Sequence, residues 1–178
     1  MPTSLAPGTD AGPIAPNYVD VLSAAEQIAG HAVRTPVLES PLLNEKLGGR
    51  LLVKAECLQL AGAFKFWGAY NRISKLNDEE KKAGVVAFSS GNHAQGVALA
   101  AKLLGAPAVV VMPKDAPVMK IENARAYGAE IVLYDRASKT AKTSVNTWRL
   151  SGPPPWCRPM TTLISLPVRV RLGWTWMR

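Results

Sequence analysis

Two short segments of the sequence combine residue types that could do chemistry. The first, Ser89-Ser90-Gly91-Asn92-His93, follows the apolar run Val85–Phe88 and opens a helical pattern. The first N–H groups of a helix are free and favour an anion, and two hydroxyls with an amide could hold a carboxylate or a ring oxygen. The simpler alternative is a helix N-cap, in which serine or asparagine satisfies the helix end and does nothing more.

The second segment is centred on Lys65, whose neighbours from Leu60 to Ala69 are mostly apolar or aromatic. Burial in such surroundings favours the neutral amine of a lysine, which could then act as a nucleophile and form a Schiff base. The simpler alternative is a surface lysine at the start of an amphipathic helix, because lysine is almost never fully buried.

The elements around both segments alternate between short apolar runs and helical patterns. The apolar runs cover 51–55, 85–88, 108–112 and 131–134, and the helical patterns cover 64–76, 93–104 and 117–127. This alternation predicts an α/β fold, a three-layer parallel sheet with flanking helices. The turn after a parallel strand is where such folds bind ligands, so the serine-rich segment is well placed. Helices are also expected over 19–28 and 41–47, with an extended connection at 34–36.

Three motifs resemble those of the threonine/serine dehydratase family, which are fold-type-II pyridoxal-phosphate enzymes and include serine racemase and threo-3-hydroxyaspartate dehydratase. The first is Glu56-x-x-Gln59-x-x-Gly62-Ala63-Phe64-Lys65-x-x-Gly68-Ala69, which resembles the cofactor-lysine motif. The second, residues 89–96, resembles the substrate loop, and its SSGNH form favours dehydratases and racemases over cysteine synthases. The third consists of Met112-Pro113, Ala116-Pro117, Lys120 and residues 127–130. The resemblance spans residues 18–136 in the family's order and spacing.

The resemblance implies pyridoxal 5'-phosphate as the cofactor and assigns three residues to it. Lys65 would be the Schiff-base lysine and the base that removes the Cα proton of the substrate. Phe64 would pack beside the pyridine ring, and Asn92 would hydrogen-bond the 3-hydroxyl oxygen of that ring. The pyridinium would be the electron sink.

The same resemblance assigns the substrate to the loop that contains Asn92. Ser89, Gly91 and His93 would help to hold the carboxylate of the amino acid. Ser90 would lie on the ring face opposite Lys65, where racemases use it as an acid and base. Two positions depart from the family: Ala63 stands where serine is frequent, and Trp67 stands where arginine is usual. We expect Trp67 to damage the packing near Lys65, because it replaces a permanent charge with an indole.

The implied function is a pyridoxal-phosphate-dependent dehydratase, or ammonia-lyase, of a hydroxy-amino acid, and threonine conversion to 2-oxobutanoate and ammonia is the first expectation. The alternatives are a serine racemase, a threo-3-hydroxyaspartate dehydratase, or an inactive truncated fragment of such an enzyme. The partner would be a small-molecule hydroxy-amino acid, and the full-length family implies a homo-oligomer.

Composition supports a globular enzyme. The chain has 178 residues, of which 48% are hydrophobic and 19% are charged, which excludes a generally disordered protein. It has no apolar run of 18 residues, no secretory leader pattern and only two cysteines, so we expect a cytoplasmic protein.

The last part of the chain differs from the rest. Residues 137–178 hold seven basic residues, no acidic residue and four of the five tryptophans. Codons can be chosen for residues 166–172 such that the last base of each codon, grouped with the first two bases of the next, encodes A-G-Q-G-T-V. The same shift from residue 152 onward permits the sequence ATLVPPYDDPYLIAGQGTVGLDLDA. This sequence resembles the dehydratase segment that follows the small domain. We infer a frameshift between about residues 135 and 142, which would remove the glycine-rich phosphate loop.

The alternative for this tail is a basic arm that binds nucleic acid or an anionic membrane. We rank it below the frameshift and expect neither partner. The expected organisation is therefore a disordered N-terminus (1–17), the first part of a large domain with Lys65 (18–76), a small parallel-sheet domain (77–136) and an aberrant basic tail (137–178).

Overall fold

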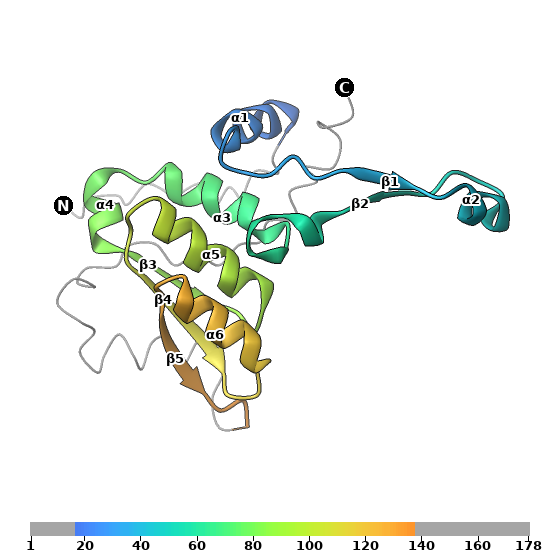
Figure 1. The fold of residues 1–178 in the computed structure, drawn as a ribbon. Helices are drawn as coiled ribbons and strands as arrows, with labels where there is room; N and C mark the ends of the chain where they lie inside the picture. Colours follow the sequence, from blue (N-terminus) through green and yellow to red (C-terminus); the bar gives the residue numbers. More distant parts are fainter. Residues whose placement is uncertain (1–16, 138–178) are drawn as a thin grey trace, which may run out of the picture.

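The computed structural model describes residues 17–137 (Figure 1). Nearly all of the expected tail and most of the expected N-terminal segment therefore lie outside the described residues. Within them, a parallel sheet contains the strands β3 (Val85–Phe88), β4 (Ala108–Pro113) and β5 (Glu130–Tyr134), in the order β3-β4-β5. The predicted α/β fold with flanking helices is thus confirmed.

The sheet explains why its strands are so apolar. Strand β4 lies between β3 and β5 and is buried along its whole length. Its residue Val109 pairs with Val86 on one side, and Val110 pairs with Ile131 on the other. A strand that is buried on both faces reads as a continuous apolar run, without an alternation of polar residues.

Two helices cover one face of this sheet. Helix α5 (Asn92–Leu103) packs against β3 and β4, and α6 (Val118–Ala126) packs against β5 (Figure 1). Helix α3 (Lys65–Ser74) lies on α5, and α1 (Tyr18–Ile28) lies on α3. One cluster of buried side chains runs through all of these elements, so the start of α3 is fixed relative to the sheet.

The expected strand at 51–55 has a different partner from the one predicted. Strand β2 (Leu52–Lys54) pairs antiparallel with β1 (Val37–Glu39), in a separate two-stranded sheet. With the predicted helix α2 (Pro41–Leu47) at its tip, this pair projects as an arm from the helices around the sheet (Figure 1). The apolar run alone could not reveal this, because the side chains of β1 and most of those of β2 are exposed here.

A small polar cluster in the arm links β1, α2 and the residue before Leu51. Arg50 donates two hydrogen bonds to the carboxylate of Glu39, of 2.8 and 2.7 Å. Asn44 donates a third, of 2.7 Å. These hydrogen bonds, first that of Arg50 and then that of Asn44, lower the pKa of the Glu39 carboxyl to about 2.

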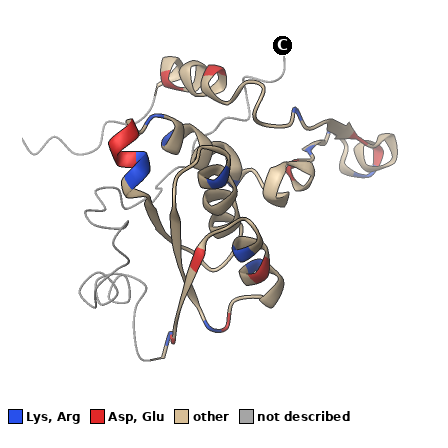
Figure 2. Ribbon diagram, turned by 60° about the vertical axis from the view of Figure 1, so that its left-hand side comes forward, with Lys and Arg blue, Asp and Glu red and all other residues tan. Residues whose placement is uncertain are grey.

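Charges of both signs are distributed over the described part of the chain. Residues 17–137 hold 14 Lys and Arg and 12 Asp and Glu. Helix α4 (Asp78–Ala83), which the sequence analysis missed, has an acidic first turn and a basic last turn (Figure 2). None of the helices within residues 17–137 is both long and apolar enough to cross a membrane.

Candidate functional site

Lys65 is the first residue of α3 and is half-buried. Two short 3-10 turns precede it, η1 (Glu56–Leu58) and η2 (Leu60–Gly62). Ala61 and Gly62 both have left-handed backbones, with φ of 58° and 65°, which turn the chain sharply toward α3. The Lys65 Nζ lies 5.0 Å from the ring centroid of Phe64, a residue that is 47% exposed. The amine is therefore neither a freely solvated surface lysine nor a fully buried one.

The serine-rich segment leads from β3 into α5. The backbone N–H of Ser89 donates to the carbonyl of Val111 (3.1 Å), and the Ser89 hydroxyl accepts from the N–H of Gly91 (3.2 Å). Gly91 is the N-cap residue of α5 and carries no side chain. The N-cap position is therefore not occupied by a serine or an asparagine, as the simpler alternative required.

Gly96 brings the two segments together. It lies one turn into α5, and a Cβ atom built on it would be 3.0 Å from the carbonyl carbon of Lys65 and 3.1 Å from the N of Phe66. A side chain here would make a tighter contact than most Cβ atoms have, so glycine favours such a close approach of two backbones. The first turn of α5, with Asn92, is thereby held beside the start of α3, with Lys65.

Lys120 of α6 is a site residue to which the sequence analysis gave no role. Its Nζ donates to the Oδ1 of Asn92, and its Cδ would be 3.5 Å from a Cβ built on Gly91. A signal was present in the sequence: Lys120 belongs to the motif that follows β4, and the ends of neighbouring parallel strands meet at one sheet edge. The sequence motif at 112–130 therefore supplies a cation beside the loop.

A cavity of about 300 Å³ lies next to this cation. It is lined by η2, α5 and α6, and its polar lining residues include Gln95, Lys120 and Asn123. The Nδ2 of Asn123 donates to the Oε1 of Gln95 (2.8 Å), which ties α6 to α5. Space for a small molecule is thus present on the side of α5 that faces η2 and α6.

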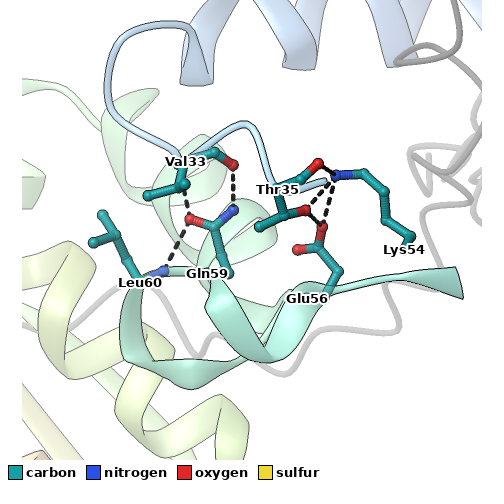
Figure 3. A network of polar contacts seen from close by, with 6 residues as sticks. All are labelled: Val33, Thr35, Lys54, Glu56, Gln59 and Leu60. Carbon is teal, nitrogen blue, oxygen red and sulfur yellow. Dashed lines mark hydrogen bonds and ion pairs between the residues drawn. The ribbon is translucent and has the colours of Figure 1, made fainter. Parts of the chain in front are cut away.

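A polar network joins the segment 33–35 to Lys54 and to the first residues of the cofactor-lysine motif (Figure 3). The Lys54 Nζ donates to the carbonyl of Thr35 (2.6 Å) and lies 3.2 Å from the Oε1 of Glu56. The Thr35 hydroxyl also hydrogen-bonds Glu56. Gln59 forms a second group of contacts with Val33. The network joins the chain before β1 to the chain before Lys65.

Trp67 is accommodated inside the core. It is 6% exposed, and the Lys54 Nζ lies 5.9 Å from its ring centroid. Its indole Nε1 is buried and has no hydrogen-bond partner among residues 17–137, and the same holds for the Oε2 of Glu56. The ring itself packs in the main core cluster. The loss of stability that this residue causes therefore comes from its unsatisfied N–H.

This geometry predicts that Trp67→Phe is nearly neutral for stability. The change removes ring volume but also removes a buried donor whose desolvation costs about 1–3 kcal/mol. We expect a free-energy change of unfolding within about 1 kcal/mol, against about 3–5 kcal/mol for Trp67→Ala. Urea unfolding followed by circular dichroism measures both. A loss for Trp67→Phe equal to that for Trp67→Ala would show that the indole N–H has a partner.

The described residues fit pyridoxal phosphate around its ring. An attachment point requires a primary amine, which Lys65 provides beside the Phe64 ring. A ring oxygen requires a donor, and the Asn92 amide lies on the adjoining turn through the Gly96 approach. The glycine-rich phosphate loop expected after residue 140 lies outside the described residues.

Comparison with known proteins agrees with this fit. The family model described as "Pyridoxal-phosphate dependent enzyme" matches residues 28–154. An L-threo-3-hydroxyaspartate ammonia-lyase from Pseudomonas sp is 53% identical over 123 residues, which are 69% of this chain and 39% of that protein. The match to the family model continues past residues 135–142, so the position of the inferred frameshift stays a prediction.

Solved structures give the same result. Maize serine racemase superimposes with a TM-score of 0.68 and 44% identity, over 74% of this chain and 40% of that one. A threonine deaminase from T.th. gives a TM-score of 0.65 and 48% identity, over 76% of this chain and 42% of that one. The chain thus spans about two fifths of the length of these relatives. The family model covers most of the residues of this chain, and the fold carries the matching motifs. The chain therefore belongs to the family of pyridoxal-phosphate-dependent enzymes.

Proposed function

We propose that the protein is an ammonia-lyase of a hydroxy-amino acid, with threonine as the first substrate and 2-oxobutanoate and ammonia as the products. The observation that carries the proposal is the close approach at Gly96, which holds Lys65 and the Asn92 turn side by side. The bound cofactor supplies a pyridinium that accepts negative charge from the substrate Cα. The chain's own residues must then position the substrate and move its protons.

Lys65 is the proposed acid and base at Cα. Its amine is half-buried at the start of a helix that α5 holds in place, so its position is well defined. Asn92 is the proposed donor to the ring oxygen. Because its Oδ1 accepts from Lys120, its Nδ2 is directed away from that cation and remains available to donate. Phe64 offers an exposed aromatic face next to the amine.

The N-terminal turn of α5 is the proposed carboxylate site. Its N-cap residue, Gly91, has no side chain, and the helix dipole favours an anion there. Ser89, Gly91 and His93 surround this turn, and the Ser89 hydroxyl already fixes the loop through Gly91. An amino acid held by its carboxylate at this turn would present its Cα toward the neighbouring start of α3.

A racemase is the second candidate, and Ser90 is the residue that supports it. Ser90 is exposed on the loop between β3 and α5. Its hydroxyl could deliver a proton to the face of Cα opposite Lys65, which would invert the stereocentre instead of eliminating the β-hydroxyl. Chiral analysis of recovered serine separates this outcome from ammonia release.

The proposal is tested with two forms of the protein: the 178-residue chain, and a frame-restored protein in which the inferred frame is corrected and the gene is read to its stop. Both are assayed for 2-oxobutanoate release from threonine, with serine and threo-3-hydroxyaspartate in parallel. We expect turnover only from the frame-restored protein, because the glycine-rich phosphate loop is expected beyond residue 140. Strong turnover by the 178-residue chain would contradict the frameshift, and its absence from both forms would contradict the function.

A further inference from the structure

Gln59 is buried, at 4% exposed, and its side-chain amide spans two segments of the chain (Figure 3). The Oε1 accepts from the backbone N–H of Val33 (2.9 Å) and from that of Leu60 (3.0 Å). The Nε2 donates to the carbonyl of Val33 (2.7 Å). An amide that both donates to and accepts from one distant backbone fixes the distance and the orientation between the two segments.

The chain that follows Gln59 forms a strained turn, which its surroundings must stabilise. Gln59 is the N-cap of η2, and its carbonyl also accepts from the N–H of Gly62 (2.8 Å). Between these bonds lies Ala61, whose φ of 58° makes it the sole non-glycine residue with positive φ within residues 17–137. A left-handed alanine is strained relative to the right-handed conformation. The turn therefore persists only because its surroundings over-determine it.

The end of the turn is held from the other side. Three residues after Ala61, the chain reaches Phe64 and then Lys65, whose backbone lies against Gly96. The residues from 60 to 64 are thus clamped at their start by Gln59 and at their end by α5. A shift at the start would move or rotate the first turn of α3, where the Lys65 side chain originates.

We infer that Gln59 is a positioning residue for Lys65, acting through the strained turn at Ala61. The inference rests on the proposed function of Lys65 as the residue that attaches the cofactor. Gln59 does not itself contact that amine. It holds the backbone in the one conformation that presents the amine beside the Asn92 turn.

The test compares Gln59→Met with Gln27→Met in the full 178-residue chain. Methionine has a similar length but makes none of the three side-chain hydrogen bonds, and Gln27 is an exposed glutamine on α1. One readout is amide exchange of Leu60 and Gly62 followed by NMR. The other is the rate at which pyridoxal phosphate and borohydride label Lys65, mapped by tandem mass spectrometry against labelling of the exposed Lys75.

We expect Gln59→Met to lose protection at Leu60 and Gly62 while the amides of α3 keep theirs. We also expect it to label Lys65 about tenfold more slowly or worse, since small misplacements of reacting groups have large kinetic costs. Gln27→Met should match the unchanged chain in both readouts. Unchanged labelling of Lys65 in Gln59→Met, or an equal loss of protection throughout α3, would overturn the inference.

A second variant separates positioning from general packing. Ala61→Gly relieves the left-handed strain, so the turn no longer needs the full hold of Gln59. The double variant Gln59→Met/Ala61→Gly should therefore regain at least about half of the lost labelling rate, whereas a packing defect would not be rescued. If Lys65 is labelled neither in the unchanged chain nor in the frame-restored protein, the proposed function fails. The amide exchange of Leu60 and Gly62 still decides the role of Gln59 in that case, because retained protection in Gln59→Met overturns it.

Discussion

Lys65→Ala is expected to lower threonine turnover by the frame-restored protein by about 10³-fold or more. The loss combines the attachment point of the cofactor with the group that moves the Cα proton, and proton transfer alone is worth about 10²–10⁴-fold. Because Lys65 is half-buried at the first turn of α3, alanine at this position should leave the fold intact. Steady-state release of 2-oxobutanoate measures the effect.

The matched control is Lys75→Ala, at the other end of the same helix. Lys75 is the exposed C-cap residue of α3, so its removal deletes one lysine from the same element without touching the site. We expect turnover within about twofold of the unchanged protein, since surface substitutions of this kind have small effects. Equal losses in the two variants would mean that Lys65 has no special part in the reaction.

Gly96→Ala is expected to destabilise the protein by about 1–3 kcal/mol, the usual cost of overpacking a filled site. Helix propensity alone predicts the opposite sign, a gain of about 0.5–1 kcal/mol when alanine replaces a glycine inside a helix. The steric cost wins because the added Cβ would meet backbone atoms of Lys65 at 3.0 and 3.1 Å, and backbone cannot rotate away. The change should also separate α5 from α3 and slow the labelling of Lys65.

Gly49→Ala is the control for this substitution. A Cβ built on Gly49 meets nothing within 4 Å, and the residue is exposed near the end of the arm. Chemical denaturation of both variants should show a change of no more than about 0.5 kcal/mol for Gly49→Ala. A stabilised Gly96→Ala variant would show that the two helices do not depend on their close approach.

The sequence predicted most reliably those elements that are buried along their whole length. The valines of β4 fit only a buried strand, and the pattern of α5 fits a helix packed against it, so the strands β3, β4 and β5 were predicted correctly. The arm was not, because β1 and β2 have three residues each and their pairing depends on a partner strand that no local pattern specifies. The exposed side chains of the arm gave no alternation to detect.

The sequence could propose residues for the candidate site, but it could not predict the contacts among them. Spacing and resemblance identified Lys65 and the loop 89–93 from two separate stretches of the chain. The contact of Lys120 with Asn92 depends on how α6 returns to the sheet, which is a tertiary feature. The hold of Gln59 on Val33 joins residues 26 positions apart, so it too required the fold.

The central claim, that Lys65 is the attachment point for pyridoxal phosphate, is tested most directly by reductive labelling. The 178-residue chain is incubated with the cofactor, reduced with borohydride, digested and mapped by tandem mass spectrometry. We expect a pyridoxyl group on Lys65 at low cofactor concentration, with the exposed lysines, such as Lys75 and Lys114, modified only at much higher concentration. Labelling spread evenly over the lysines, or directed to another lysine while Lys65 stays unmodified, would contradict it.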